Sequence, residues 1–265
     1  MILYQHPLSP FAQKIRIALR EKGVSFAVRS PDGPVALLNP RVELPALDDG
    51  GVVIFDSTII LEYLEDRFPN PPLLPSGAAE RAKVRMVEEV CDTHYEAINW
   101  GLGELRFFER APGALGEKLG QRAKQQTRNL HRWLESILGG VAWLNGPQFG
   151  WGDLAAAPYV SMSQMFDLAP EPGTLLADWF ERVMLRPSVA ATVDEARASL
   201  PAMAGAAQRV RDGRMKRQYR DHRLEWMIRS GGLQVVLDGI AADNIRFTGT
   251  APFAEAATGP KESKS

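Results

Sequence analysis

The chain has 265 residues, of which 45% are hydrophobic and 24% are charged, a globular composition with enough length for two small domains. Its 31 Lys and Arg against 32 Asp and Glu give a net charge of −1, which excludes a long-range field that would attract nucleic acid or an anionic membrane. Cys91 is the only cysteine, so an intrachain disulfide, a CxxC pair and a zinc site of several thiolates are excluded. The N-terminal residues lack the basic segment that begins a signal peptide, and the sequence has no apolar run long enough to span a membrane. We therefore expect a soluble, cytoplasmic protein without a metal, and neither membrane nor nucleic acid as a partner.

The first seventy residues alternate between strand and helix patterns. A short apolar run at residues 2–4 predicts a strand, and a helical pattern follows from Pro10 through Lys22. Gly23 suits the left-handed residue that ends this helix, and residues 25–28 predict a second strand. One face of the helix is apolar, and its cations are expected to supply polar surface: Lys14, Arg16, Arg20 and Lys22.

A hairpin and a second helix come next. Pro45 opens a strand at residues 44–47, and the Asp-Asp-Gly-Gly turn leads into a strand at residues 52–55. Asp56 and Ser57 then cap a helix that Pro69 stops. The order βαβ followed by ββα is that of an α/β thioredoxin-like domain, which we place at residues 1–70.

The remainder of the chain predicts helices almost throughout. Residues 71–77 are rich in Pro and Gly and predict a linker. An all-α domain is expected at residues 78–205, and a helical extension with a disordered tail past Phe247 at residues 206–265. Residues 78–109 are expected to form one long helix or two abutting ones, weakened at Gly101 and Gly103. Further helices are expected at residues 116–138, 154–165, 174–185 and 188–200.

Three segments of the first domain resemble the omega and zeta classes of glutathione transferases, and bacterial members in particular. Residues 9–23 resemble their first turn and helix, residues 39–47 resemble the loop before their third strand, and residues 56–64 resemble the start of their third helix. The resemblance implies a glutathione-binding domain followed by an all-helical domain, in a protein that forms a homodimer.

The same resemblance implies ligands for glutathione. A cis bond before Pro45 would let Leu44 present its backbone N–H and C=O to the cysteinyl unit as an added strand would. Ser57, at a helix N-terminus, would bind the γ-glutamyl carboxylate, and Asp56 would bind the amine. Phe11 completes the implied cofactor-binding residues.

Ser9 falls where the omega class has a cysteine and the zeta class a serine. A cysteine would form a mixed disulfide, whereas a serine hydroxyl can only donate a hydrogen bond to the thiolate of bound glutathione and lower its pKa. Ser9 is therefore the expected catalytic residue. The expected reaction is attack of the thiolate on a hydrophobic electrophile, as in detoxification, by conjugation, dehalogenation, ether cleavage or isomerisation.

Some features depart from the family's pattern. The loop at residues 41–43 lacks the glycine often found there, and Arg41 is the candidate ligand for the glycyl carboxylate of glutathione. Gly150 and Asp153 keep only part of the family's helix-capping box, in which Ser or Thr leads. The alternative function is therefore a non-catalytic transferase-fold module for protein interaction.

Several other side chains have two readings. Four aromatic residues could line a pocket for an apolar co-substrate or pack in the core: Tyr95, Trp100, Phe107 and Phe108. The histidines lack metal-binding spacing and are expected to be non-catalytic: His6, His94, His131 and His222. Cys91 is expected to be a small buried residue.

Residues 209–229 form a local basic stretch. We interpret it as the solvated face of one extra helix, with a polyanion contact as the alternative. The side chains expected to dock this helix are Tyr219, Leu224, Trp226 and Met227.

Overall fold

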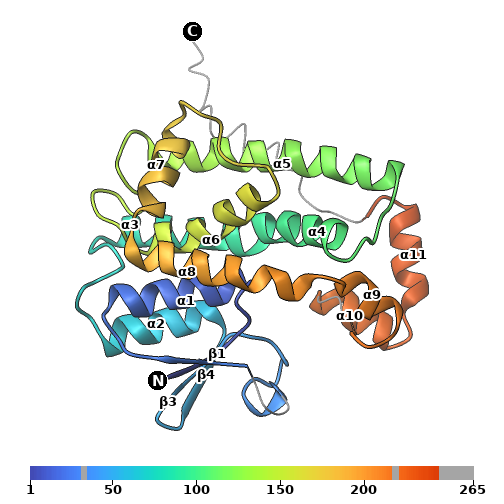
Figure 1. Cartoon of the computed structure of the whole chain (residues 1–265), viewed down its shortest axis with the longest axis horizontal. Helices are drawn as coiled ribbons and strands as arrows, with labels where there is room; N and C mark the ends of the chain where they lie inside the picture. The colour runs from blue at the N-terminus through green and yellow to red at the C-terminus, as the bar shows by residue number, and fades with distance from the viewer. Residues whose placement is uncertain (31–34, 217–220, 245–265) are drawn as a thin grey trace.

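The computed structural model describes residues 1–30, 35–216 and 221–244, and Figure 1 shows a small sheet with two helices beside a larger group of helices. The sheet has four strands in the order β2-β1-β3-β4, with β1 parallel to β2 and β3 antiparallel to both of its neighbours. The strands are β1 (Ile2–Tyr4), β2 (Ala27–Arg29), β3 (Ala46–Asp49) and β4 (Val52–Phe55). Helices α1 (Pro10–Glu21) and α2 (Ser57–Arg67) accompany them, with a 3-10 turn η1 (Val35–Leu37). The thioredoxin-like prediction is confirmed.

The boundaries of this part follow local signals. Ser9 caps α1, and Gly23 follows its end with a φ of 65°, the left-handed conformation that a glycine adopts without a steric cost. Asp56 caps α2, as predicted. The second strand begins at Ala27, two residues later than the apolar pattern predicts, and the third runs from Ala46 to Asp49.

The larger part is all-helical, as predicted. Its central helix α6 contains twelve buried residues of fifteen and contacts α1, α3, α4, α7 and α8. The elements are α3 (Ala78–Val90), a π-helical turn η2 (Cys91–Tyr95), α4 (Glu96–Arg106), α5 (Ala114–Leu138), α6 (Trp151–Met165), α7 (Leu175–Met184), α8 (Pro187–Ser199) and a 3-10 turn η3 (Leu200–Met203). Two α-helices joined directly by η2 occupy most of the segment where one long helix or two abutting helices were expected. The weakening expected at Gly101 and Gly103 does not interrupt the helix, since both lie inside α4, and the change in helical geometry falls at η2. A glycine inside a helix costs only about 1 kcal/mol, which tertiary packing outweighs.

The cations of α1 are not polar surface, and that prediction is wrong. Lys14 is fully buried, Arg16 is 1% exposed and Lys22 is 8% exposed. Helix α1 packs against α2 on one side and against α6 and α8 on the other, so solvent reaches neither side of the helix along most of its length. Each cation therefore pairs with a carboxylate from another element, in the pairs Lys14–Glu88, Lys14–Asp92, Arg16–Glu195, Arg20–Glu195 and Lys22–Glu65.

Lys14 is the centre of a buried network that joins the two parts of the chain. Its Nζ lies 2.5 Å from Glu88 Oε1 and also binds Asp92 Oδ2. Burial would lower the pKa of Lys14, but Asp92 and Glu88 outweigh it and raise that pKa, so the ammonium stays charged. The carboxylates accept further hydrogen bonds from Thr58 Oγ1 at 2.9 Å, Trp151 Nε1 at 2.6 Å and Tyr159 Oη at 2.8 Å.

The start of α6 is built around the buried carboxylate of Asp153. It accepts hydrogen bonds from Leu144 N at 2.8 Å, Gly150 N at 3.0 Å and Trp179 Nε1 at 2.7 Å. The half of the capping box that Asp153 supplies is therefore present, as predicted. A side chain at position 150 would overlap the Leu73 carbonyl oxygen, which accepts from Trp151 N, and this close approach explains the glycine.

The C-terminal extension differs from the single helix expected there. It contains α9 (Ala206–Arg211), α10 (His222–Arg229) and α11 (Leu233–Ala241), at the end of the molecule opposite α7 in Figure 1. Trp226 is 66% exposed and Leu224 is 38% exposed, so the expectation that they dock the helix is wrong. Tyr219 and the tail past Phe247 lie outside the described residues.

No helix within residues 1–30, 35–216 and 221–244 is long and apolar enough to cross a membrane. In the same ranges, no group of three or more His, Cys, Asp or Glu side chains is placed to hold a metal ion.

Replacing Lys14 tests the buried network. Lys14→Met should lower the free energy of unfolding by about 3–5 kcal/mol, because it leaves two carboxylates buried without their cation. Arg128→Met is the matched control, since Arg128 and Glu171 form a pair in which the side chains are 46% and 66% exposed. The control should cost no more than about 1 kcal/mol. Urea denaturation measures both, and equal losses would contradict a stabilising role for the network.

Replacing Gly150 tests the close approach to Leu73. Gly150→Ala should cost about 1–3 kcal/mol in urea denaturation, because the added methyl group displaces the backbone. Gly120, inside α5, has no atom within 4 Å of an added Cβ, so Gly120→Ala is the matched control. It should stabilise the protein by about 0.5–1 kcal/mol. If both substitutions changed the free energy of unfolding in the same direction, the steric explanation for Gly150 would be refuted.

Candidate active site

Three segments meet at one edge of the sheet because of how the strands pair. Tyr4 at the end of β1 pairs with Ala46 at the start of β3, and Ala46 pairs with Phe55 at the end of β4. The segments that follow β1, precede β3 and follow β4 therefore leave the sheet at the same edge. They carry Ser9, Leu44, Pro45, Asp56 and Ser57.

Ser9 lies at the N-terminus of α1, where the turn after β1 delivers it. Its backbone N–H donates to the His6 carbonyl at 3.0 Å, which closes the turn. Its Oγ accepts from Ala12 N at 3.4 Å, and because this contact uses an oxygen lone pair, the hydroxyl proton can be donated to another acceptor. Ser9 is half-buried, and the positive end of the helix dipole lies beside it. The position suits hydrogen-bond donation to an anion.

The loop before β3 is held by Asn39. Its Nδ2 donates to the Glu43 carbonyl at 3.0 Å, and its Oδ1 accepts from Arg41 N at 2.9 Å. Val42 has a φ of 57°, the left-handed region where glycine is favoured, so this loop adopts a glycine-like turn without a glycine. The bond between Leu44 and Pro45 is cis, as the resemblance implies.

Asp56 and Ser57 form the start of α2. Asp56 has a φ of 72°, and its Oδ1 accepts from Thr58 N at 3.0 Å and from Ile59 N at 3.3 Å. Its Oδ2 lies 3.6 Å from Arg41 Nη1, so one carboxylate oxygen caps the helix and the other faces the loop before β3. Ser57 is 6% exposed, and its hydroxyl has no hydrogen-bond partner in the part of the chain that the structure describes. A serine hydroxyl at a helix N-terminus suits a carboxylate ligand.

Phe11 lies where α1 meets the helical part. Its ring is edge-on to Tyr159 at a centroid distance of 6.3 Å, and Lys14 Nζ is 5.8 Å from its centroid. Phe11 comes two residues after Ser9 in the sequence and is half-buried. Its contacts place it at the boundary between the two parts of the chain.

The four aromatic candidates for a co-substrate pocket divide between core and partly exposed positions. Tyr95 is fully buried, with its hydroxyl 2.6 Å from His131 Nε2, and Phe108 is 9% exposed, so both pack in the interior. Trp100 and Phe107 are half-buried, and the ring of Phe107 packs against Phe166.

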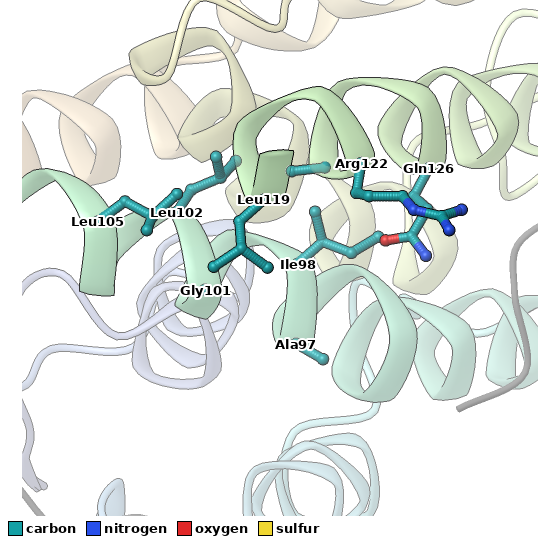
Figure 2. A pocket seen from close by; sticks show the side chains of 9 residues that line it. Ala97, Ile98, Gly101, Leu102, Leu105, Leu119, Arg122 and Gln126 are labelled. Atoms are coloured by element: carbon teal, nitrogen blue, oxygen red, sulfur yellow. The ribbon is translucent and has the colours of Figure 1, made fainter. Parts of the chain in front are cut away.

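A cavity of about 290 Å³ lies elsewhere, between α4 and α5 (Figure 2). Aliphatic residues line it, including Ile98, Leu102 and Leu119, and Arg122 lies at one end. None of the four aromatic candidates lines this cavity, so it is not the pocket that the sequence predicts.

Two buried titratable side chains lie outside the candidate site at the edge of the sheet. Burial lowers the pKa of His131 to about 4, so its imidazole is neutral at physiological pH. Cys91 is fully buried, as predicted, and burial raises the pKa of its thiol well above its usual value. A thiol held in its protonated form is a poor nucleophile.

Comparisons with known proteins agree with this arrangement. Residues 3–72 match the family described as the glutathione S-transferase N-terminal domain, and residues 104–187 match the glutathione S-transferase C-terminal domain. Glutathione S-transferase 1 of Dianthus caryophyllus is 34% identical over 173 residues, which cover 62% of this chain and 77% of that protein. A stringent starvation protein A homolog of Coxiella burnetii is 40% identical over 92 residues, 33% of this chain, and the match spans only 44% of that protein.

A solved structure resembles both parts of the chain. A glutathione S-transferase from Methylobacterium radiotolerans, crystallised in complex with glutathione sulfonate, superimposes with a TM-score of 0.62 at 29% sequence identity. The superposition covers 72% of this chain and 93% of that one.

Proposed function

Because the chain belongs to the glutathione S-transferase superfamily, we propose that it binds glutathione at the sheet edge and directs the glutathione thiolate at a hydrophobic electrophile. The observation that supports this most is the meeting of three segments at that edge, one of which has the cis bond before Pro45. The related structure that was crystallised with glutathione sulfonate adds support for the ligand.

Each proposed ligand matches one group of the tripeptide. The backbone of Leu44 pairs with the cysteinyl unit in the manner of an added strand. The Ser57 hydroxyl and the first N–H groups of α2 bind the γ-glutamyl carboxylate, assisted by the helix dipole. Asp56 Oδ2 accepts from the γ-glutamyl amine, and Phe11 borders the site where α1 meets the helical part.

Ser9 then acts on the thiol. Its hydroxyl donates a hydrogen bond to sulfur, and a hydrogen bond to the charged form lowers the pKa of the bound thiol. The N-terminus of α1 adds positive potential at the same point. The thiolate forms a bond to an electrophilic carbon and expels a leaving group, or adds to a double bond. Conjugation, dehalogenation, ether cleavage and isomerisation all start from this thiolate, as detoxification reactions commonly do.

A homodimer in the cytoplasm is part of the proposal. Several large apolar side chains on both parts of the chain are exposed in the single subunit. A second copy of the chain would cover these side chains. They include Val52 and Ile59 at 55% exposure, Met86 at 55% and Leu119 at 44%.

A second candidate is a transferase-fold module that binds a protein partner without catalysis. Two observations favour it: the similarity to stringent starvation protein A homologs, whose name states no enzyme activity, and the apolar side chains exposed on α10 and α11. A partner captured by the full chain but lost on deleting residues 206–265, without any glutathione binding, would support this candidate.

Two serine substitutions separate binding from chemistry. Ser57→Ala should weaken glutathione roughly tenfold in calorimetric titration, because a hydrogen bond to a carboxylate is lost. Ser9→Ala should bind glutathione nearly as well, yet turn over a model electrophile about ten- to a hundredfold more slowly, because the thiolate loses its donor. Ser136→Ala, exposed on α5, is the matched control and should change neither quantity.

The outcomes distinguish the candidates. Unchanged turnover in Ser9→Ala would remove Ser9 from the mechanism, and no glutathione binding to the unsubstituted protein would favour the interaction module.

A further inference from the structure

The C-terminal extension reaches the loop that precedes β3. Arg41 Nη2 lies 2.8 Å from Nε2 of His222, the first residue of α10, although the two residues are 181 positions apart. A guanidinium can only donate, so the imidazole accepts through Nε2 and carries its proton on Nδ1. Nδ1 faces the Glu225 carboxylate at 3.7 Å. A side chain of the extension therefore holds a side chain of the sheet-containing part.

Arg41 is also next to the proposed glutathione ligands. Its Nη1 lies 3.6 Å from Asp56 Oδ2, and its Nη2 lies 3.0 Å from Glu43 Oε2. The Arg41 side chain is 44% exposed, so a ligand can reach it. The planar guanidinium is suited to binding a carboxylate through two parallel hydrogen bonds. The glycyl carboxylate is the charged group of glutathione that the proposed function leaves without a ligand.

We propose that Arg41 binds the glycyl carboxylate and that His222 is a positioning residue that orients the Arg41 guanidinium. The inference rests on the proposed function, because it completes the same glutathione site. Glu43 and Asp56 already place negative charge around Arg41, and a further carboxylate anchor would compete with the ligand. A neutral imidazole fixes the guanidinium without adding negative charge, which leaves the cation suited to an incoming carboxylate.

This arrangement gives the extension a role in binding. Its first helix is tethered by Arg211, whose Nη1 lies 2.9 Å from Glu109 Oε2 just after α4. Its second helix is tethered by His222 at Arg41. The two glutathione S-transferase family models match no residue beyond 187. On this proposal, the affinity for glutathione also depends on residues that neither model includes.

Titration of the full chain with two ligands tests the proposal. Glutathione and its C-terminal amide, γ-glutamylcysteinylglycinamide, differ only at the glycyl carboxyl group, so the comparison reports on the glycyl carboxylate. His222→Ala should weaken glutathione roughly five- to tenfold and leave binding of the C-terminal amide unchanged, because one hydrogen bond that orients Arg41 toward the carboxylate is lost. Arg41→Ala should weaken glutathione further. His222→Gln, whose amide oxygen can accept from Arg41, should restore most of the affinity.

Arg229→Ala, at the other end of α10, is the matched control and should affect neither ligand. Equal losses for both ligands in His222→Ala, no loss for either, or no recovery in His222→Gln would overturn the positioning role while the proposed function stands. Failure of the unsubstituted protein to bind either ligand would overturn the proposed function and this inference together.

Discussion

The ammonium group of Lys14 is fully buried where the sheet-containing part meets the helices behind it. An isolated charge in such a place is costly, so the position of every group around it is constrained. Glu88 and Asp92 supply the counter-charge from α3 and η2. Trp151 and Tyr159 donate to the two carboxylate oxygens that Lys14 does not bind, and Thr58 donates to the Glu88 oxygen that Lys14 does bind. Because Lys14 is on the helix whose N-terminus carries Ser9, the network fixes the catalytic candidate relative to the helical part.

The candidate site depends on the register of the sheet more than on any single side chain. The row of paired residues Tyr4, Ala46 and Phe55 brings three loops to one edge, and each loop offers a group that a helix terminus or a turn has already oriented. Ser9 and Asp56 both cap helices, so the hydrogen bonds that stabilise α1 and α2 also hold the site. Two of the residues proposed to act on glutathione therefore also stabilise helices, and Asp56 does so with a φ of 72°.

The features that sequence predicted are those with local signals. Ser9 before a proline, the Asp-Gly turn, and Asp56 with Ser57 act on neighbours within a few residues, so the elements and caps they predict are present. The π-helical turn at Cys91–Tyr95 was missed. The burial of Lys14 and the contact between Arg41 and His222 were also missed, because their partners lie far along the chain. Lys14 and Glu88 are 74 positions apart, for example. One available signal was the presence of apolar residues on both faces of α1, such as Ile15 and Ile17, which indicates a helix covered on both sides.

If Ser9 stabilises the thiolate of bound glutathione, as proposed, the pKa of the bound thiol depends on the Ser9 hydroxyl. The ultraviolet absorbance of the thiolate, followed against pH with saturating protein, gives this pKa for the unsubstituted chain and for Ser9→Ala. We expect a pKa below that of free glutathione in the unsubstituted protein and a rise towards the free value in the variant. A bound thiol that titrates like free glutathione, or a lowered pKa that survives the substitution, would contradict the role of Ser9.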